Sequence, residues 1–450
     1  MKATAARRQI LHEGLEANVD DLSAGLADLD VEVVAEVCEA LLATRRRGRR
    51  VFLFGNGGSA ALASHMACDL NHLPAPPGFR PFDARSLVDN VAVLTALAND
   101  TSYENVFSAQ IDAMATAGDL AVAISCSGES ANVLRAVEAA RAAGLVTVAL
   151  TGDAGGRLAG SVDLCVRAPA AQIWQQENLH LAVEHAICDA IRQLTAATAR
   201  RVEASRRAIV LCAGLGTRLG DLVRDRPKPM VPIGGQPALE LTLAWLRRYG
   251  FERVAINLHH HPESVMDHFG DGSDRGLDLV YYREPELLGT AGAIARLDGF
   301  VAEGPLLVVY GDVLTDLDLL ELMSHHSERV LLDPSTAATL AVHHVPEPSR
   351  AGLVELDGDG RVTAFVEKPP VEEVRHDLGS AGVLVLEPAA IAEISRDGAS
   401  DLAQDLFPAL LEKGYPIFGW ALPATARLID FGTPETYRRA QREWGGGAAS

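Results

Sequence analysis

The stretch LCAGLGTRLGDLVRDRPKPM (residues 211–230) leads from a short apolar run into a glycine turn and then into a stiff, basic loop. Gly214 and Gly216 allow the backbone to approach an anion closely, and Arg218 adds a planar fork of hydrogen-bond donors. Lys228 lies between two prolines, which restrict its backbone and hold its ammonium group at a fixed place. The stretch lacks the GxxxxGK[ST] pattern of a Walker loop. It therefore predicts another kind of phosphate-binding turn at the end of a strand, with an ordinary polar loop as the alternative.

The rest of the second half alternates strands with helices. Strands are expected at 207–213, 252–258, 277–282 and 305–310, and helices near 237–249 and 290–299. The stretch LVELDGDGRVTAFVEKP predicts a hairpin with a DGDG turn. This order of elements predicts a Rossmann-like domain with a mixed sheet.

Two carboxylates follow buried strands in this half. Asp312 ends the strand in VVYGDV, and Asp430 ends the strand in LIDFGTPETYRRA. A carboxylate at the carboxyl end of a strand is well placed to hold Mg²⁺ against nucleotide phosphates. Two aspartates together with a lysine and an arginine are typical of phosphoryl or nucleotidyl transfer, in which catalysis depends on charge neutralisation and alignment.

The first half contains two further loops of the phosphate-binding kind. GNGGS (55–59) follows a strand at 51–55 and precedes a helix near 59–71, and SCSGES (125–130) follows a strand at 119–125. Backbone N–H groups and serine hydroxyls at the start of a helix favour an anion. Two serine-rich turns in one parallel sheet suit a phosphate monoester.

The first of these loops has a second interpretation. The spacing of Gly55, Gly57 and Ala60 matches the dinucleotide fingerprint GxGxxA. However, no acidic residue clearly ends a second strand about 20 residues further on, as an NAD site requires. The phosphate monoester is therefore favoured.

Composition and the segment TAATARRVEASRR (195–207) predict two domains. The 450 residues are too many for one ordinary core, and a chain with 48% hydrophobic but 5% aromatic residues suits α/β layers. Helices are expected at 8–45 and about 172–196, so the first half is predicted to be a parallel-sheet α/β sandwich. Segment 195–207 is small, polar and basic, without an apolar period, and marks the boundary. The predicted domains are 1–197 and 207–445, joined by a linker at 198–206.

Charge and cysteine content exclude several classes of protein. A net charge of -20 argues against a nucleic-acid or anionic-membrane binder, which needs clustered basic residues. No run approaches the roughly 20 apolar residues of a membrane span, and the N-terminus lacks the apolar core of a signal peptide. Six scattered cysteines form no disulfide framework. These features predict a cytoplasmic protein.

Two helices of the first half carry side chains of the metal-binding type. His65 and Asp69 are four residues apart, so they share one helix face. The helix that begins with QQENLHLAVEH carries four more candidates, Glu177, His180, Glu184 and His185. Such side chains form a divalent-metal site or an acid/base pair that moves a proton between adjacent carbons. Solvated charges around a core histidine are the competing interpretation.

Five motifs, GNGGS, SHMACDL, AND, SCSGESANV and ENLHLAVEH, together resemble the sugar isomerase (SIS) domain of phosphoheptose isomerases over about residues 8–197. That family converts sedoheptulose 7-phosphate to D-glycero-D-manno-heptose 7-phosphate through an enediol, commonly with zinc, and usually as a tetramer. The resemblance implies that Asp69 is the base and His185 the acid. It implies a zinc site made by His65, Asp69, Glu177 and His185. It also implies a substrate site made by Asn56, Gly57, Ser59, Asp100, Ser125, Ser127 and Ser130.

This chain departs from the better-known isomerases at two positions. Asp69 replaces a glutamate, so the base reaches one methylene less far, and Glu177 replaces a glutamine. Both retain oxygen ligands. The resemblance therefore favours an active isomerase, with a regulatory sugar-phosphate-binding module as the alternative.

Six ordered motifs, LCAGLGTRL, PKPM, ELLGTAGAI, YGD, FVEKP and DFGTPETY, resemble the sugar-1-phosphate nucleotidyltransferases over about residues 206–443. In that family a sugar 1-phosphate oxygen attacks the α-phosphate of a nucleoside triphosphate and releases pyrophosphate. The resemblance implies that Arg218 and Lys228 are catalytic, that Asp312 and Asp430 bind Mg²⁺, and that Glu367 and Lys368 contact the sugar phosphate. It implies a nucleotide site made by Leu211, Ala213, Gly214, Gly216, Thr217, Arg218, Lys228, Gly289, Thr290 and Gly292. Cys212-Ala213 replaces the Ala-Gly of many members.

The fusion of these two halves indicates one pathway. The PKPM and ELLGTAGAI motifs look most like guanylyltransferases for D-glycero-D-manno-heptose 1-phosphate, and the isomerase-like half favours heptose as the sugar. The expected function is therefore two steps towards GDP-heptose, with GTP as the nucleotide and with no nucleic-acid or membrane partner. The rivals are a mannose-1-phosphate or other hexose-1-phosphate enzyme with a sensor SIS domain, and a binding protein with two degenerate sites.

Three other motifs receive ordinary structural interpretations. NLHHHPE (257–263) is expected to be a surface turn whose adjacent histidines point apart, and RRRGRR (45–50) is expected to be a solvated helix end. His343 and His344 are expected at a strand end.

Overall fold

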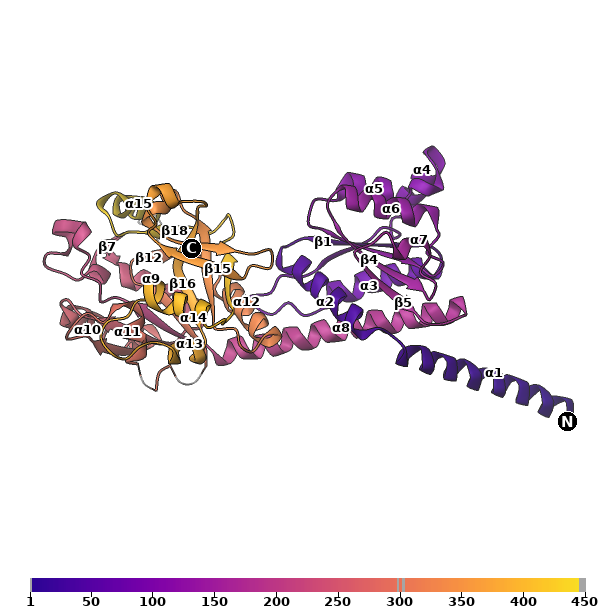
Figure 1. Cartoon of the computed structure of the whole chain (residues 1–450), viewed down its shortest axis with the longest axis horizontal. Helices are drawn as coiled ribbons and strands as arrows, with labels where there is room; N and C mark the ends of the chain where they lie inside the picture. The colour runs from indigo at the N-terminus through magenta and orange to yellow at the C-terminus, as the bar shows by residue number, and fades with distance from the viewer. Residues whose placement is uncertain (1, 298, 302–303, 445–450) are drawn as a thin grey trace. The chain divides into compact units, whose positions relative to one another are not determined.

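Alternating side chains on the strands of the N-terminal half build an apolar layer on each face of a parallel sheet. The computed structural model describes residues 2–297, 299–301 and 304–444. The chain divides into unit 1, Met1–Ala196, and unit 2, Ala197–Ser450 (Figure 1). On the first strand Val51 and Leu53 belong to one core, and Phe52 and Phe54 belong to the other.

The unit 1 sheet has the strand order β2-β1-β3-β4-β5, with every pair parallel. The strands are β1 (Arg50–Gly55), β2 (Asp83–Ser86), β3 (Leu120–Ser125), β4 (Val146–Gly152) and β5 (Leu164–Ala168). The helices are α1 (Lys2–Ala27), α2 (Val31–Arg46), α3 (Gly58–His72), α4 (Val91–Asp100), α5 (Ser108–Met114), α6 (Ala131–Ala142), α7 (Gly156–Ala159) and α8 (Ile173–Ala204). Helices α2, α3 and α8 cover one face, and α5, α6 and α7 cover the other. The strand order reverses between β1 and β3, which is where a doubly wound sheet binds its ligand.

The expected helical region 8–45 is two helices. α1 ends at Ala27 and α2 begins after Asp30, whose carboxylate accepts hydrogen bonds from the backbone N–H groups of Glu32 and Val33. An aspartate with extended backbone in this position stabilises the start of a new helix.

Unit 2 is built around a mixed sheet whose main path is β10-β9-β6-β11-β16-β13-β17. The strands are β6 (Arg207–Leu211), β9 (Arg253–Leu258), β10 (Asp278–Arg283), β11 (Leu306–Tyr310), β13 (Ala338–His344), β14 (Gly352–Leu356), β15 (Val362–Glu367), β16 (Leu378–Leu386) and β17 (Ile417–Ala421), with the small pairs β7 (Pro232–Ile233) with β8 (Gln236–Pro237) and β12 (Val313–Thr315) with β18 (Leu428–Asp430). β16 runs antiparallel to both β11 and β13, whereas β6, β9, β10 and β11 run parallel. The predicted hairpin is β14 and β15.

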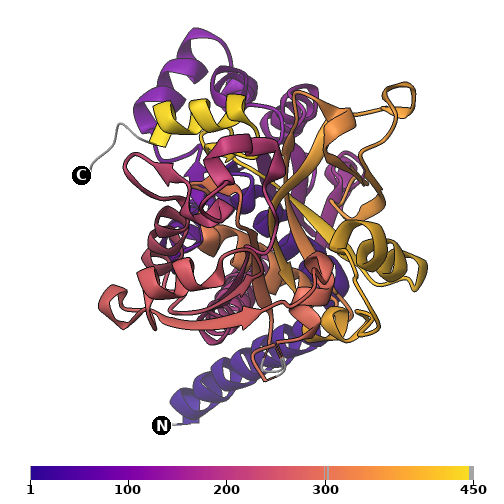
Figure 2. The same cartoon turned by 90° about the vertical axis from the view of Figure 1, so that its left-hand side faces the viewer.

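Helices cover both faces of the unit 2 sheet (Figure 2). Helices α11 (Gly289–Ala295), α13 (Pro388–Ala392) and α14 (Phe407–Glu412) cover one face, and α9 (Ala238–Arg248), α10 (Pro262–Phe269) and α12 (Leu319–Leu332) cover the other; α15 (Pro434–Trp444) follows β18. The strand order reverses between β6 and β11, so a ligand site is expected outside their carboxyl ends. The predicted fold class is confirmed for both halves.

The helix predicted at 172–196 is eight residues longer than expected, since α8 ends at Ala204. It therefore includes most of the predicted linker. Alanine-rich sequence favours helix, and two side chains of the extension pack inside unit 2. Val202 joins the unit 2 core, and Arg201 pairs with Glu387, which also accepts a 2.8 Å hydrogen bond from buried His326. These tertiary contacts, which an apolar period cannot reveal, stabilise the added turns.

Two of the ordinary interpretations need correction. Arg45 is buried rather than solvated, because its guanidinium donates to the Pro74 carbonyl and to the Thr195 hydroxyl and lies over the rings of Phe79 and Phe82. Two of the adjacent histidines of the 257–263 turn, His260 and His261, do not point apart, since their ring centroids are 4.1 Å apart. Within the described ranges, no helix is both long enough and apolar enough to cross a membrane.

Candidate active sites

Three serine hydroxyls converge at the carboxyl edge of the unit 1 sheet. Ser125 Oγ lies 3.5 Å from Ser127 Oγ and 3.4 Å from Ser130 Oγ. Ser130 is the N-cap of α6, yet its side chain makes no capping hydrogen bond. The hydroxyls and the helix N-terminus together can bind an anion such as a phosphate.

Asparagine side chains join the two predicted substrate loops. Asn56, after β1, donates to Asn132 Oδ1 at 2.8 Å and accepts from Asn132 Nδ2 at 2.9 Å. The Tyr103 hydroxyl also donates to Asn56 Oδ1, at 3.0 Å. Gly57 has φ 58°, and no atom lies within 4 Å of the position that its Cβ would take, so the backbone is open to a ligand.

Ser59 and Asp100 differ in their surroundings. Ser59 is buried near the start of α3. Asp100 is exposed at the end of α4, where the side chain of Asn99 donates to it at 2.9 Å. The structure therefore brings Asn56 and the three serines of the second loop to the carboxyl edge of the unit 1 sheet. The hydrogen bond described for Asp100 is with Asn99, the residue before it in the chain.

A cluster of two histidines and two carboxylates lies between α3 and α8. The ligand atoms of His65, Asp69, Glu184 and His185 all lie within 4.8 Å of one another, which makes this group a possible metal site. His65 Nε2 is 3.1 Å from His185 Nε2, and Glu184 Oε2 is 3.4 Å from His185 Nε2. Burial raises the pKa of Glu184 above its ordinary value.

Glu177, the fourth zinc ligand that the family resemblance implied, lies at another place on α8. Its carboxylate rests against the start of α3, where a Cβ on Gly58 would be 2.2 Å from Glu177 Oε1. Glu177, His65 and His180 line a cavity of about 300 Å³. His180 is a buried core histidine that donates to the Thr151 carbonyl at 2.8 Å, and burial lowers its pKa.

In unit 2 a cavity of about 480 Å³ opens where the strand order reverses. Ten of the predicted residues line it: Leu211, Ala213, Gly214, Gly216, Thr217, Arg218, Lys228, Gly289, Thr290 and Asp312. Leu211 ends β6, and Asp312 follows β11 by two residues, so the first and last of these lie at neighbouring carboxyl ends. The structure thus brings residues separated by about a hundred positions to one cavity.

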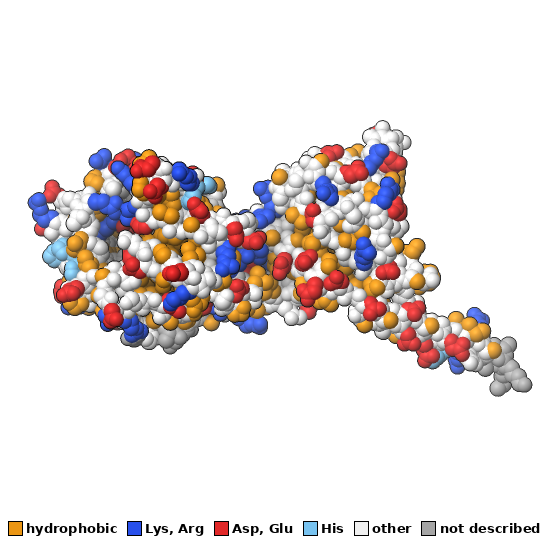
Figure 3. Space-filling view, in the orientation of Figure 1, with side chains coloured by type: hydrophobic (Ala, Val, Ile, Leu, Met, Phe, Trp, Pro, Cys, Tyr) orange, Lys and Arg blue, Asp and Glu red, His pale blue; other side chains and the backbone are white. Residues whose placement is uncertain are grey.

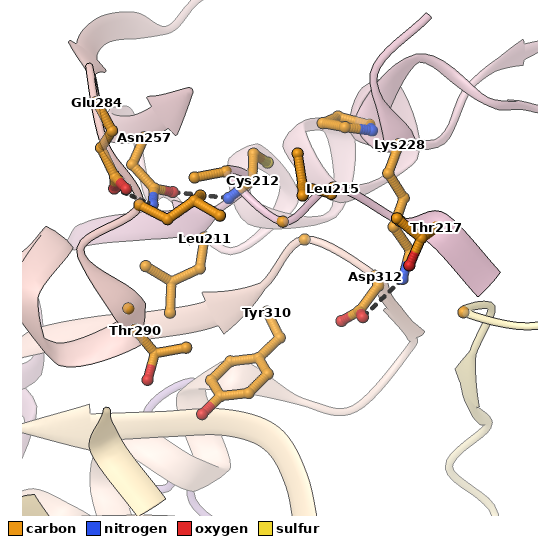
Figure 4. Close-up of a pocket in the computed structure, with 18 of the residues that line it drawn as sticks. Leu211, Cys212, Leu215, Thr217, Lys228, Asn257, Glu284, Thr290, Tyr310 and Asp312 are labelled. Carbon is orange, nitrogen blue, oxygen red and sulfur yellow. Dashed lines mark hydrogen bonds and ion pairs between the residues drawn. The ribbon is translucent and has the colours of Figure 1, made fainter. Parts of the chain in front are cut away.

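Basic and acidic groups meet at one end of this cavity (Figure 4). Lys228 Nζ lies 2.7 Å from Asp312 Oδ2, and the lysine is largely buried. Val313, the residue after Asp312, pairs with Asp430 in the β12–β18 ladder, so the two aspartates lie near each other in space. Burial and the charge of Asp312 raise the pKa of Asp430 above its ordinary value.

Gly432 marks the point where these groups converge. A Cβ there would lie 2.8 Å from Asp430 Oδ1, 3.1 Å from Lys228 Nζ and 3.3 Å from an Arg218 guanidinium nitrogen. The absence of a side chain leaves a small space bounded by two cations and a carboxylate. This donor set fits a phosphate together with the divalent cation that oxygen ligands prefer.

The other end of the cavity is held by a network that the sequence interpretation missed. Asn257 Oδ1 accepts from the backbone N–H of Cys212 at 2.7 Å, and Asn257 Nδ2 donates to Glu284 Oε1 at 2.8 Å (Figure 4). Leu288 N donates to Glu284 Oε2 at 3.1 Å. Asn257 and Glu284 lie at the ends of β9 and β10, so a search for polar residues at strand ends could have found them.

Four predicted residues of this unit, Asp430 among them, lie beside the lining rather than in it. Gly292 N donates to the Ser400 carbonyl at 3.0 Å. Glu367 and Lys368 pair with each other at the end of β15, and Lys368 adopts φ 47°. A lysine in the left-handed region is a strained conformation of the kind often found at functional sites.

Replacing Gly289 by alanine should weaken nucleotide binding and lower the free energy of unfolding of unit 2 by about 1–2 kcal/mol, since its φ is 75°. A Cβ at Gly289 would also lie 2.4 Å from the Ser400 carbonyl oxygen, which accepts from two N–H groups of α11. Urea unfolding and the KM for the triphosphate measure the two effects. Gly358→Ala is the matched control, because its Cβ would meet no atom within 4 Å. Equal behaviour of the two variants would contradict the expectation.

Comparison with known proteins gives two family matches. The model of the nucleotidyl transferase family matches residues 207–444, and that of the SIS domain matches residues 16–152. A phosphoheptose isomerase from Rhodospirillum rubrum is 42% identical over 155 residues, which are 34% of this chain and 82% of that protein.

Two relatives match the second half. A mannose-1-phosphate guanylyltransferase from Mycobacterium tuberculosis is 35% identical over 52% of this chain and 64% of its own length. A UTP--glucose-1-phosphate uridylyltransferase from Synechocystis is 32% identical over 52% of this chain and 62% of its own length. The chain thus spans less than two thirds of the length of each of these two relatives.

The folds and sites define a fusion of a sugar isomerase domain with a nucleotidyltransferase domain. More specifically, the chain belongs to the nucleotidyl transferase family through its second half and to the phosphoheptose isomerase family through its first. Both resemblances drawn from the sequence are confirmed.

Proposed function

We propose that this chain is a bifunctional enzyme of GDP-heptose synthesis. Residues 1–197 isomerise sedoheptulose 7-phosphate to D-glycero-D-manno-heptose 7-phosphate. Residues 207–445 transfer GMP from GTP to D-glycero-D-manno-heptose 1-phosphate and release pyrophosphate. The observation that carries the proposal is that each sheet places polar side chains able to bind an anion at its own switch point, with ionisable groups nearby in unit 1 and a lysine-aspartate pair in unit 2.

In the isomerase half the chain's residues hold the phosphate and move one proton. The hydroxyls of Ser125, Ser127 and Ser130 bind the 7-phosphate. Asp69 removes a proton from C1 of the ketose while O2 gains one, which gives the enediol. O1 then loses a proton as His185, through the ring nitrogen that is not a metal ligand, returns one to C2, which gives the aldose. Asp100 and Asn56 contact the sugar chain.

The isomerase half is proposed to use zinc. The family resemblance names His65, Asp69, Glu177 and His185 as its ligands, and the close approach of His65 Nε2 and His185 Nε2, 3.1 Å, fits two nitrogen ligands of one ion. When bound, zinc would polarise the substrate oxygens beside the carbons that exchange the proton.

In the nucleotidyltransferase half, an oxygen of the sugar 1-phosphate attacks the α-phosphorus of GTP while the bond to the leaving pyrophosphate breaks. Lys228 and Arg218 neutralise charge on the phosphates, and Glu367 with Lys368 holds the sugar phosphate. Asp312 and Asp430 would hold Mg²⁺, which when bound would neutralise charge on the phosphates.

A buried carboxylate at the far end of the cavity supports guanine as the base. Glu284 accepts one hydrogen bond on each oxygen and retains further acceptor positions, because an ionised carboxylate has about four. Guanine presents two adjacent donors, N1–H and the 2-amino group, to such an acceptor. Uracil, cytosine and adenine do not present two adjacent donors.

The first half is proposed to assemble into a homo-oligomer, a tetramer by family resemblance. Ile10, Leu11, Leu15 and Val19 of α1 are between 58% and 70% exposed in the single chain, and Figure 3 shows hydrophobic side chains among the charged ones along this helix. Exposed apolar stripes of this kind mark subunit contacts. Light scattering measures the number of subunits. A cytoplasmic location, which the six unpaired cysteines support, stays a prediction.

The second candidate is a mannose-1-phosphate guanylyltransferase with a regulatory SIS domain, which the relative from Mycobacterium tuberculosis favours. The test measures pyrophosphate release with Mg²⁺, pairing GTP, ATP, CTP and UTP with heptose 1-phosphate, mannose 1-phosphate and glucose 1-phosphate. The same protein is assayed for isomerisation of sedoheptulose 7-phosphate. Preference for GTP with heptose 1-phosphate, plus isomerisation, is expected. Preference for a hexose 1-phosphate, without isomerisation, would reject the proposal in favour of the second candidate.

A further inference from the structure

We propose that Tyr103 and Asn132 are positioning residues of the isomerase site, which hold the amide of Asn56 so that its free N–H faces the substrate. This inference rests on the proposed isomerase function, in which Asn56 contacts the sugar chain. It gives a role to two residues to which the family resemblance assigned none.

The first observation is that two asparagines form a reciprocal pair. Asn56 Nδ2 donates to Asn132 Oδ1 at 2.8 Å, and Asn132 Nδ2 donates to Asn56 Oδ1 at 2.9 Å. Turning either amide by 180° about its last bond would place oxygen against oxygen and nitrogen against nitrogen. Each amide of the pair therefore fixes the orientation of the other.

The second observation is that Asn132 is itself held in place. Its side chain is buried, and its Oδ1 also accepts from the backbone N–H of Val133 at 3.0 Å. A backbone N–H can only donate, so this contact identifies the oxygen of Asn132 and, through the pair, the oxygen of Asn56. Asn132 is the second residue of α6, which begins directly after Ser130. The pair thus ties Asn56 to the loop that carries the three serine hydroxyls.

The third observation is that Tyr103 occupies the remaining acceptor position of Asn56. The Tyr103 hydroxyl donates to Asn56 Oδ1 at 3.0 Å. An amide oxygen has two lone pairs, and an amide nitrogen has two hydrogens. Both lone pairs of Asn56 Oδ1 are used, whereas one Nδ2 hydrogen has no partner among the described residues. Asn56 therefore offers a ligand a donor and not an acceptor.

The network lies where a ligand is expected. Asn56 follows β1 and Asn132 follows the loop after β3, and these are the strands between which the order of the unit 1 sheet reverses. Tyr103 reaches the same place from η1 (Tyr103–Asn105), a short helix after α4. The oxygens of an ionised phosphate are acceptors only, and sugar hydroxyls and carbonyls also accept. A donor with a fixed direction therefore suits a sugar phosphate.

The test measures binding and turnover separately in the full-length protein. Wild type, Tyr103→Phe and Asn132→Ala are titrated by calorimetry with sedoheptitol 7-phosphate, the reduced ketose, which has no carbonyl to isomerise. The Kd for this probe and the KM for sedoheptulose 7-phosphate are expected to rise about 3–10-fold in Y103F, the effect of one lost hydrogen bond. N132A, which loses both bonds of the pair, should raise them at least as much. The kcat should change by less than about twofold, because Asn56 holds ground state and transition state alike.

A double-mutant cycle separates positioning from a general loss of structure. If Tyr103 acts through Asn56, Y103F should change the Kd of an Asn56→Ala protein by less than about twofold. Ser161→Ala is the control, because it removes a hydroxyl that donates to the Arg157 carbonyl outside the two substrate loops. It should keep the wild-type Kd and KM. Tyr103 is 61% exposed, so Y103F should melt at the wild-type temperature, and it decides the test if N132A does not fold.

The outcomes distinguish the inference from the proposed function. Unchanged Kd and KM in Y103F would overturn the inference, as would an equal loss in the N56A background or a wild type that does not bind the probe. If the wild type isomerises the ketose while Y103F behaves like it, the proposed function stands and only the positioning role falls. A wild type that binds the probe without isomerising the ketose, and loses affinity in Y103F, supports the positioning role but rejects the isomerase.

Discussion

Replacing Lys228 by alanine is expected to slow pyrophosphate release by about 10²–10³-fold, the scale for removing one preorganised charge from a transition state. Lys228 is largely buried, and its ammonium lies 2.7 Å from Asp312 and close to Asp430. Its removal leaves two neighbouring carboxylates without their fixed cation, at the point where the leaving phosphates gain charge. Single-turnover kinetics with GTP and excess Mg²⁺ measure the loss.

The matched control for this variant is Lys413→Ala. Lys413 is an exposed lysine of the same unit that pairs with Glu393, away from the cavity lining. The control should release pyrophosphate at the wild-type rate, and isomerisation should be unaffected in both variants because unit 1 has its own site. If K228A retained more than about a tenth of the wild-type rate of pyrophosphate release, a catalytic role of Lys228 would be contradicted.

Replacing His185 by asparagine is expected to reduce isomerisation by about 10²–10⁴-fold, the contribution of a positioned acid or base. His185 Nε2 lies 3.1 Å from His65 Nε2 and is half-exposed, so it faces both the cluster and the solvent-accessible side where a sugar would enter. The substitution removes both a ligand and the group that returns the proton to C2. Isomerisation is measured by coupled detection of the aldose product.

His72→Gln is the control for this prediction. His72 ends the same helix that carries His65, and it interacts with the Cys68 carbonyl rather than with the cluster. Pyrophosphate release should stay at the wild-type rate in both histidine variants. Zinc content separates the two causes, because a variant that retains zinc but not activity has lost the acid alone. Near-normal isomerisation in H185N would contradict the proposed mechanism.

Much of the fold and of both sites could be predicted because the information is local. Each strand-to-glycine turn, serine-rich helix start and sequence motif involves only a few adjacent residues. Parallel strands bring their carboxyl ends to one edge of the sheet, and a site forms there where the strand order reverses. Hence Ser125, Gly216 and Asp312 could be selected before the structure was known. The C-terminal end of α8 and the burial of Arg45 could not, because both depend on contacts with residues more than twenty positions away.

By itself, the sequence determined the two α/β halves, the two family memberships and the strand ends at which the sites lie, since these follow from periodicity and short motifs. Only the tertiary structure decided which polar residues meet. Glu177 and Glu184 are seven residues apart, and helical periodicity places them on the same stripe of α8. The packing of α3 against that stripe determines that Glu184 joins His65 while Glu177 reaches Gly58. Spacing along one helix defines a face, but the position of a side chain's partner depends on a second element.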